Sequence, residues 1–230
     1  MKESIYTIPI NEIFENRCGC PVCRIYSITE EKYLEYIMGA AMMEPDVRIE
    51  VNRLGFCKSH YKKMQQRRNR LSLALMLQSH LEQIQKDVFS KGKMLSFSGD
   101  KKRIYKVAKI QETCFICGQI EQAMSKTIEN VFLIFEREPA FRELYSEQEF
   151  ICLPHYRLLS ERAAAGMNKK YADVFLKMTG ALTQNYLHTL YDDVTHFTKM
   201  FDYRNSGEQA DWGNAKDSIE RAVAFLEIED

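Results

Sequence analysis

Cys20-Pro-Val-Cys23, followed after 33 residues by Cys57-Lys-Ser-His60, is the part of the sequence that sets the expected fold. The same arrangement returns as Cys114-Phe-Ile-Cys117 and, after 34 residues, Cys152-Leu-Pro-His155. Each histidine is followed by a tyrosine, and each copy carries a Glu-Pro-x-x-Arg segment whose proline stands 25 residues after the first cysteine. Matched spacings at this many points predict an internal duplication, in which one ancestral unit is used twice.

The chemistry of these residue types predicts metal binding. A Cys-x-x-Cys pair lets two thiolates converge on one ion, and a Cys-x-x-His pair at a helix start places its two ligands on one face. Together they form a Cys₃His set, which suits a closed tetrahedral zinc site and leaves no position for a catalytic water. We therefore predict two structural Zn²⁺ sites, one in each copy. The predicted ligands are Cys20, Cys23, Cys57 and His60 in the first copy, and Cys114, Cys117, Cys152 and His155 in the second.

Three alternatives to zinc binding are open to the cysteines. An iron–sulfur cluster is less favoured than zinc, because each set contains a histidine and lacks a fourth cysteine. A Cys-x-x-Cys thiol-redox protein normally carries its motif in a strand–helix setting, which this chain does not offer. The third alternative is a set of buried structural thiols, but burial alone does not require the three-residue spacing that the motifs share. Cys18, the seventh cysteine, is expected to be a bystander near the site, with substitution for Cys20 or Cys23 as the alternative.

The spacing of apolar residues at steps of three and four predicts a mostly α fold of two related helical halves with long amphipathic helices. The Glu-Pro steps are expected to end the helices before them, because proline disfavours helical backbone at the preceding residue. Residues 104–110 are the single candidate for a short strand. The expected helices cover residues 24–43, a long stretch from His60 to Val88, residues 118–137, residues 168–204, and a short segment through Ile219, Val223 and Leu226.

The expected domain organisation follows the duplication. The first half is residues 1–95, the second is residues 101–204, and residues 205–230 form a loop and a short helix that pack on the body, with one compact domain as the alternative. The Gly- and Ser-containing stretch 90–100 is the best linker between the copies, and residues 205–213 form a second break.

The formal net charge of zero conceals a polarised chain. Residues 1–113 carry 20 Lys and Arg against 13 Asp and Glu, whereas residues 114–230 carry 12 against 19. The halves are thus +7 and −7, and we expect them to pack through this asymmetry, within one chain or between chains as self-association.

A basic run after the first Cys-x-x-His motif offers a different function. On a helix it would add salt-dependent affinity for phosphates, which makes nucleic-acid binding an alternative. The simpler interpretation is a solvated helix face, or one that faces acids such as the seven in residues 207–230. The six residues are Lys58, Lys62, Lys63, Arg67, Arg68 and Arg70.

No catalytic motif is present: the sequence lacks a Gly-rich phosphate loop, a Gly-x-Ser-x-Gly elbow and a His-Glu-x-x-His helix. His188 and His196 lie near one helix face with Asp192 and Asp193 between them, which allows a carboxylate–histidine metal site but is more simply explained by surface contacts. The favoured function is therefore a scaffold or interaction protein, not an enzyme, that binds an unknown protein partner or itself.

The expected compartment is the cytoplasm. The N-terminus carries Glu3, Glu12 and Glu15 and lacks the apolar core of a secretory signal. The longest apolar runs, 73–77 and 131–135, are far shorter than the roughly 20 residues that cross a bilayer, so no membrane association is expected. Seven cysteines in a reducing compartment favour metal chemistry over disulfides.

The chain resembles an uncharacterised bacterial family that is defined only as a domain of unknown function. The sequence departs from the family pattern at one point. The two residues before Cys152 are Phe150-Ile151, where the family pattern reads Gly-Phe, as Gly55-Phe56 does before Cys57. The conformation of the turn before Cys152 is therefore not implied by the resemblance, whereas the role of Cys152 as a ligand is. The resemblance implies a bacterial protein and supplies no mechanism. For the tail motifs, including Asp202–Asn205 and Trp212, the plain expectation is a fixed helix–loop–helix corner, with a ligand site as the alternative. The resemblance is carried by Tyr6–Pro9, Cys20–Cys23, Gly55–Cys57 with His60, Cys114–Cys117, Phe150–His155, Phe201–Asn205 and Trp212–Asp217.

Overall fold

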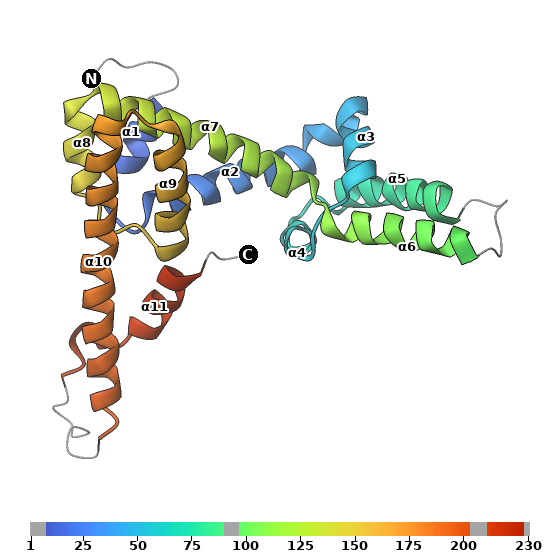
Figure 1. Cartoon of the computed structure of the whole chain (residues 1–230). Coiled ribbons are helices and arrows are strands. Elements are labelled where there is room, and N and C mark those ends of the chain that lie inside the picture. The colour runs from blue at the N-terminus through green and yellow to red at the C-terminus, as the bar shows by residue number, and fades with distance from the viewer. Residues whose placement is uncertain (1–7, 90–96, 203–210, 228–230) are drawn as a thin grey trace. The chain divides into compact units, whose positions relative to one another are not determined.

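The computed structural model describes residues 8–89, 97–202 and 211–227, and every element within these ranges is a helix (Figure 1). The mostly α prediction is therefore confirmed. The α-helices are α1 (Ile8–Glu15), α2 (Pro21–Met38), α3 (Pro45–Leu54), α4 (Lys58–Gln65), α5 (Arg70–Phe89), α6 (Phe97–Glu112), α7 (Phe115–Arg137), α8 (Pro139–Ser146), α9 (Leu153–Gly166), α10 (Lys169–Lys199) and α11 (Ser218–Leu226). Two short 3₁₀ helices, η1 (Ala40–Met43) and η2 (Gly213–Ala215), complete the described elements.

Two expectations about secondary structure are wrong. Residues 104–110 form the middle of helix α6, not a strand. The long helix expected from His60 to Val88 is broken into α4 and α5, because Asn69 begins a new helix there: its side-chain oxygen accepts a hydrogen bond from the Ser72 amide at 3.3 Å. Of the two predicted breaks, residues 90–96 and 203–210 lie outside the described part of the chain.

The long amphipathic helix of the C-terminal region is confirmed as α10. Its first turn is capped by Asn168, whose side chain accepts a hydrogen bond from the Lys170 amide at 3.1 Å. At about 1.5 Å per residue, its 31 residues extend for about 46 Å. Phe175, Tyr186 and Leu190, spaced at helical intervals, are buried along one side. The predicted short helix near the C-terminus is confirmed as α11.

Proline marks the start of several helices. Pro21, Pro45 and Pro139 are each the first residue of a helix, a position at which the backbone N–H has no partner within the helix and proline loses nothing. In each Glu-Pro step the glutamate has an extended backbone conformation, and the proline after it is the first residue of the next helix.

The chain divides into two compact units, and the first is discontinuous in sequence. Unit 1 is Met1–Ile25 with Ser125–Asp230, and unit 2 is Tyr26–Met124. The boundaries fall inside α2 and inside α7. The predicted division into 1–95, 101–204 and 205–230 does not coincide with these units, because segments from both predicted halves belong to unit 1.

Unit 1 is built around a cluster of aromatic rings from four helices. Tyr145 of α8 lies at its centre, with its ring centroid 4.9 Å from Phe175, 5.6 Å from Phe135 and 5.8 Å from Phe14. Phe141 joins the cluster 5.0 Å from Phe14, and all five side chains are fully buried. The buried Tyr145 hydroxyl shares a 2.8 Å hydrogen bond with Thr179, so its polar atom is satisfied inside the apolar cluster.

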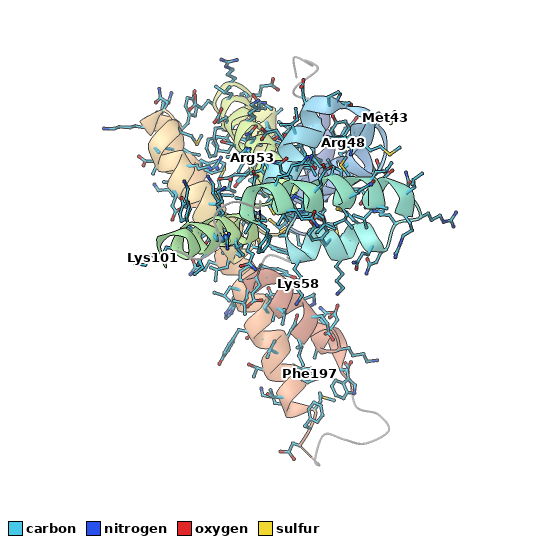
Figure 2. The ribbon with its side chains drawn as sticks, turned by 90° about the vertical axis from the view of Figure 1, so that its right-hand side faces the viewer. Met43, Arg48, Arg53, Lys58, Lys101 and Phe197 are labelled. Atoms are coloured by element: carbon cyan, nitrogen blue, oxygen red, sulfur yellow. The ribbon has the colours of Figure 1, made fainter. Side chains whose placement is uncertain are left out.

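Unit 2 packs α3 against α5 around buried Val51 and Met76. Two side chains tie its helices together. Asn69 donates to the Met38 carbonyl at 2.7 Å, which joins the start of α5 to the end of α2. Arg48 of α3, labelled in Figure 2, lies 3.4 Å from the Leu75 carbonyl of α5.

The aromatic cluster predicts a large stability loss on truncation. Phe175→Ala removes a fully buried ring that contacts three others, and large-to-small changes of this kind cost about 3–5 kcal/mol. The adjacent Val174, 40% exposed on the same helix, is the matched control, and Val174→Ala should change stability by less than about 1 kcal/mol. Urea denaturation of both variants measures the difference, and equal midpoints would contradict the assigned core.

Candidate metal centres

All four Cys-containing motifs lie at helix N-termini. Cys57 and Cys152 are the N-cap residues of α4 and α9, while Cys20 and Cys114 immediately precede α2 and α7. Each of these four cysteines contributes its carbonyl to the first helical hydrogen bond, as in Tyr61 N to Cys57 O at 3.0 Å. The three-residue spacing therefore has a simple structural meaning: the first ligand caps a helix and the second is the third residue of its first turn.

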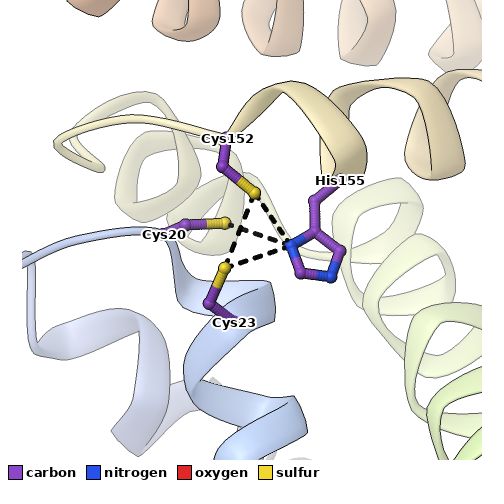
Figure 3. Close-up of side chains that lie close together, drawn as sticks. All are labelled: Cys20, Cys23, Cys152 and His155. Carbon is purple, nitrogen blue, oxygen red and sulfur yellow. Dashed lines mark hydrogen bonds between the residues drawn. The ribbon is translucent and has the colours of Figure 1, made fainter. Parts of the chain in front are cut away.

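The first cluster joins Cys20 and Cys23 to Cys152 and His155, all within unit 1 (Figure 3). The Nδ1 atom of His155 lies 3.0 Å from the Cys152 sulfur, 3.2 Å from that of Cys23 and 3.7 Å from that of Cys20. The sulfurs of Cys23 and Cys152 are 3.5 Å apart.

The second cluster joins Cys57 and His60 to Cys114 and Cys117, all within unit 2. The Nδ1 atom of His60 lies 3.0 Å from the Cys57 sulfur and 3.4 Å from each of the other two. The sulfurs of Cys57 and Cys117 are 3.8 Å apart.

These distances match the edges of a zinc-centred tetrahedron. Bond lengths of ~2.3 Å to sulfur and ~2.05 Å to nitrogen give edges of roughly 3.8 Å between sulfurs and roughly 3.6 Å between sulfur and nitrogen. In the two clusters the sulfur–sulfur distances are 3.5 and 3.8 Å and the sulfur–nitrogen distances are 3.0 to 3.7 Å, all within about 0.6 Å of these values. Each donor set can therefore close around one ion with small side-chain adjustments.

The predicted grouping of the ligands is wrong, although the eight residues are the same. The duplication predicts that each Cys-x-x-Cys joins the Cys-x-x-His of its own copy, whereas in the structure each pairs with that of the other copy. The intervening helices explain the exchange. The 18 residues of α2 rise about 27 Å and the 23 residues of α7 about 34 Å, so each carries the chain away from the cysteines at its start.

Contacts beside the first cluster hold its two loops together. The Gly19 amide donates to Glu149 at 2.5 Å, and Arg17 forms a 2.6 Å ion pair with Glu147. Gln148, which is buried, donates to the Phe14 carbonyl at 2.7 Å. The residues before Cys20 are thus fixed to the residues before Cys152, and the two helix N-termini face a common point.

The second cluster uses backbone contacts for the same purpose. The Phe115 amide donates to the Gly55 carbonyl at 2.9 Å, and the Thr113 hydroxyl donates to the Leu54 carbonyl at 2.8 Å. The residue that corresponds to Phe115 in the other Cys-x-x-Cys motif is Pro21, which has no amide proton. The first cluster therefore uses the Gly19 amide and the Glu149 side chain instead.

The thiols of the first cluster influence one another electrostatically. Burial opposes ionisation of Cys20, yet hydrogen bonds with Cys152, Cys23 and His155 hold its pKa well below the usual value. Hydrogen bonds with Cys152 and Cys20, together with burial, raise the pKa of Cys23, and the hydrogen bond with Cys20 raises the pKa of Cys152 to about 12. Ionisation of one thiol thus opposes ionisation of the other two, and a divalent cation would supply the charge that lets all three ionise.

Burial is the main cause of the pKa changes in the second cluster. It raises the pKa of Cys114, and it also raises the pKa of Cys117, where the neighbouring Cys114 adds to the effect. Burial lowers the pKa of His60, which favours the neutral imidazole that metals bind. This cluster is the more accessible of the two, since Cys117 is exposed, whereas Cys20, Cys152 and His155 of the first cluster are buried.

His60 has an acidic neighbour that the sequence analysis did not identify. Its Nε2 atom, on the side of the ring away from the cluster, lies 3.2 Å from a Glu30 oxygen, and Lys63 contacts the same oxygen at 2.7 Å. A carboxylate at this position favours a proton on Nε2, which would leave Nδ1 as the ligand atom. No spacing rule connects Glu30 to His60, because they come from different helices.

The other candidate residues do not gather into a site. Cys18 is exposed and belongs to neither cluster. His188 lies 3.7 Å from Asp192 on the surface, and His196 contacts the Asp211 carbonyl at 2.8 Å, so no carboxylate–histidine cluster forms among the described residues. Trp212 packs against Phe197 and Phe201 at 5.6 and 6.0 Å, while residues 203–205 of the tail motif lie outside the described chain.

The six basic residues after Cys57 are not one continuous free face. Lys63 is bound to Glu30, and Arg67 forms a two-pronged contact with Glu31, one arm of it at 2.6 Å. Arg70 donates to the Gln65 carbonyl at 2.8 Å. Lys58, Lys62 and Arg68 are exposed. Half of the run is thus engaged within its own unit, and its acidic partners lie on α2 instead of the C-terminal segment.

The chain belongs to a family of unknown function, DUF6062, whose model matches residues 1–229. The match confirms the family resemblance inferred from the duplicated motifs and the tail. No curated protein and no solved structure matches the chain. Within the described ranges, no helix is both long enough and apolar enough to cross a membrane.

Gly55 should be a sensitive position next to the second cluster. Its φ is +63°, and an added Cβ would lie 2.9 Å from Nε2 of buried His80, whose ring is held by a 2.8 Å contact with the Asn52 carbonyl. We expect Gly55→Ala to destabilise the chain by about 1–3 kcal/mol in urea denaturation. Gly118, one residue after Cys117, is the control: an added Cβ meets nothing within 4 Å, so Gly118→Ala should be neutral or stabilising. The reverse order would contradict the assigned backbone.

Proposed function

We propose that the chain is a helical scaffold or interaction protein in which two structural Zn²⁺ ions fasten pairs of helix N-termini. The observation that carries this proposal is the convergence, twice, of three cysteine sulfurs and one histidine Nδ1 within 4.8 Å of one another. Both sets draw on helices far apart in sequence, up to 135 residues in the first cluster. A bound ion in each would act as a cross-link, and its binding energy would contribute directly to folding.

The donor set favours zinc and a structural role. Three thiolates and one imidazole are a common closed environment for zinc, whereas cubane iron–sulfur clusters usually take four cysteines. Four protein ligands leave no open coordination position for substrate or water, which supports a structural role over a catalytic one. All seven cysteines are free thiols, which supports a reducing compartment such as the cytoplasm.

An interaction role is supported by apolar residues exposed along the last two helices. Leu187 and Tyr191 of α10 are 47% and 68% exposed, and Val223 and Leu226 of α11 are 56% and 50% exposed. Large apolar side chains grouped on a surface commonly mark contact sites in proteins. The duplicated motifs are best explained by one ancestral metal-binding unit whose two copies now exchange their ligand pairs.

The exchanged grouping of ligands gives a direct test by metal stoichiometry. We expect about two zinc ions per chain by elemental analysis of protein purified without chelator. The double variant Cys20→Ser/Cys152→Ser damages one cluster and should keep about one ion, whereas Cys20→Ser/Cys57→Ser damages both and should lose both. Cys18→Ser is the control and should keep two.

If Cys20→Ser/Cys152→Ser lost both ions and Cys20→Ser/Cys57→Ser kept one, the ligands would be grouped within each copy and not between copies. Substoichiometric metal in the intact chain would reject the zinc proposal. Thermal denaturation adds the structural criterion. Each double variant should unfold at a lower temperature than Cys18→Ser, because the lost ion no longer contributes to folding. Unchanged thermal stability would reject a structural role.

The contact between Glu30 and His60 predicts a selective change in metal affinity. Removing an outer carboxylate of this kind typically weakens binding about 10- to 100-fold. Glu30→Gln should therefore release one of the two ions at lower chelator concentration, while the adjacent Glu31→Gln, which alters only the contact with Arg67, should not. A chelator competition that follows both ions separates the variants, and identical release curves would contradict the role of Glu30.

A further inference from the structure

Helix α6 presents an aromatic ring among lysines on its solvent side. From Lys101 to Gln111 the helix carries no acidic residue. Tyr105 is 68% exposed, and Lys101, Lys102 and Lys109 stand at positions −4, −3 and +4 from it, the helical spacings that place side chains beside one another. All three lysines are exposed. We call Lys101, Lys102, Tyr105 and Lys109 the α6 basic face.

The α6 basic face is not the side of the helix that packs into unit 2. The opposite side of α6 packs against α5: Lys106 donates to the Asp87 carbonyl at 2.7 Å, and Ile110 lies with Ile84 along one small cavity. The apolar residues Val107 and Ile110 are therefore partly covered, while Tyr105 faces solvent. With 68% of its surface exposed, the Tyr105 side chain is accessible to a ligand.

A second basic segment, at the start of α4, lies next to the cluster of Cys57, His60, Cys114 and Cys117. Lys58 and Lys62 of α4 are exposed and one helical turn apart, and Lys58 directly follows Cys57. Because Cys57 and Cys114 belong to the same cluster, the start of α4 and the end of α6 are held near each other. Figure 2, which looks onto unit 2, labels Lys58 and Lys101, one from each of these two helices.

We propose that the α6 basic face binds single-stranded nucleic acid, with Tyr105 stacking on a base and the lysines contacting phosphates. Unit 2 as a whole carries 17 Lys and Arg against 11 Asp and Glu, so the field around the face is positive. Stacking on an exposed aromatic combined with a basic surface is the usual way in which proteins bind single strands without sequence preference.

The chemistry of the face favours a single strand over other polyanions. Bases in a duplex are stacked on one another and offer no open ring to Tyr105. A membrane-surface helix needs a broad apolar face to insert among lipids. On the described part of α6 the exposed large hydrophobic residues are only Ile104 and Tyr105, while Ile110 lies with Ile84 of α5 along one small cavity. The proposal rests on the proposed metal centre only for the placement of Lys58 and Lys62.

The test is a titration of the full, metal-loaded chain with a fluorescently labelled 20-nucleotide poly(U) RNA at several salt concentrations. Tyr105→Ala should weaken binding at least about fivefold, while Tyr105→Phe, which keeps the ring, should bind as the unaltered chain does. Lys101→Gln/Lys102→Gln/Lys109→Gln should reduce the slope of log affinity against log salt by about 2, since each phosphate contact on a single strand contributes about 0.7.

The matched control is Lys169→Gln/Lys177→Gln/Lys216→Gln, which lowers the net charge equally with three exposed lysines of unit 1. It should retain the slope. No binding at 50 mM salt, equal binding of Tyr105→Ala, or equal losses in both triple variants would overturn the proposal. Binding to phosphatidylserine vesicles or duplex DNA that exceeds binding to the RNA would overturn it as well.

The metal content of every preparation is measured in parallel. A chain that holds two zinc ions and does not bind RNA refutes this inference and leaves the proposed function intact. A chain that lacks zinc but binds RNA through Tyr105 refutes the metal centres and supports the α6 basic face. Circular dichroism of each variant confirms that α6 substitutions, which lie on the exposed side of the helix, leave the fold unchanged.

Discussion

The structure depends on bringing two helix N-termini to one point, twice. The first turn of a helix ends in unpaired N–H groups and carries a partial positive charge, so two such ends repel unless a negative group lies between them. The cysteine sulfurs can provide that group, because three thiolates with one divalent ion would leave a net negative charge that both helix ends stabilise. Cys57 and Cys152 occupy N-cap positions, where a serine or aspartate would serve an isolated helix. The metal chemistry and the helix chemistry are therefore satisfied by the same atoms.

Each cluster is embedded in its unit by different means. In unit 1 the Thr183 hydroxyl donates to the carbonyl of buried Ile151 at 2.9 Å, and Phe150 stacks on Tyr186 with ring centroids 3.8 Å apart. The turn that departs from the family pattern is thus stabilised by an aromatic pair. In unit 2 the corresponding turn uses Gly55 in a positive φ conformation, packed against His80. The turns before the two Cys-x-x-His motifs thus differ in their stabilising contacts, although the motifs have the same geometry.

The sequence was sufficient to predict the eight clustered residues and the helical fold, because both follow from local spacing. Three-residue intervals place ligands at one helix end, and the apolar period identified α10 and α11. The grouping of the ligands was not predictable from local spacing, since it depends on the positions in space that the chain reaches at the ends of helices α2 and α7. Glu30 was missed for the same reason: its relation to His60 exists only across helices. The break between α4 and α5 was local, and the capping asparagine at position 69 was the signal for it.

The exchanged clusters are nested along the chain, and this has a consequence for assembly. The inner cluster spans Cys57 to Cys117, a separation of 60 residues, and lies wholly within the 129 residues that separate Cys23 from Cys152. During synthesis all inner ligands emerge before the outer set is complete. Once the inner cluster is closed, the path that the outer cluster must close shortens to about 70 residues, which lowers its entropic cost by about 0.5 kcal/mol. An ion in the inner cluster would thus make closure of the outer cluster entropically less costly.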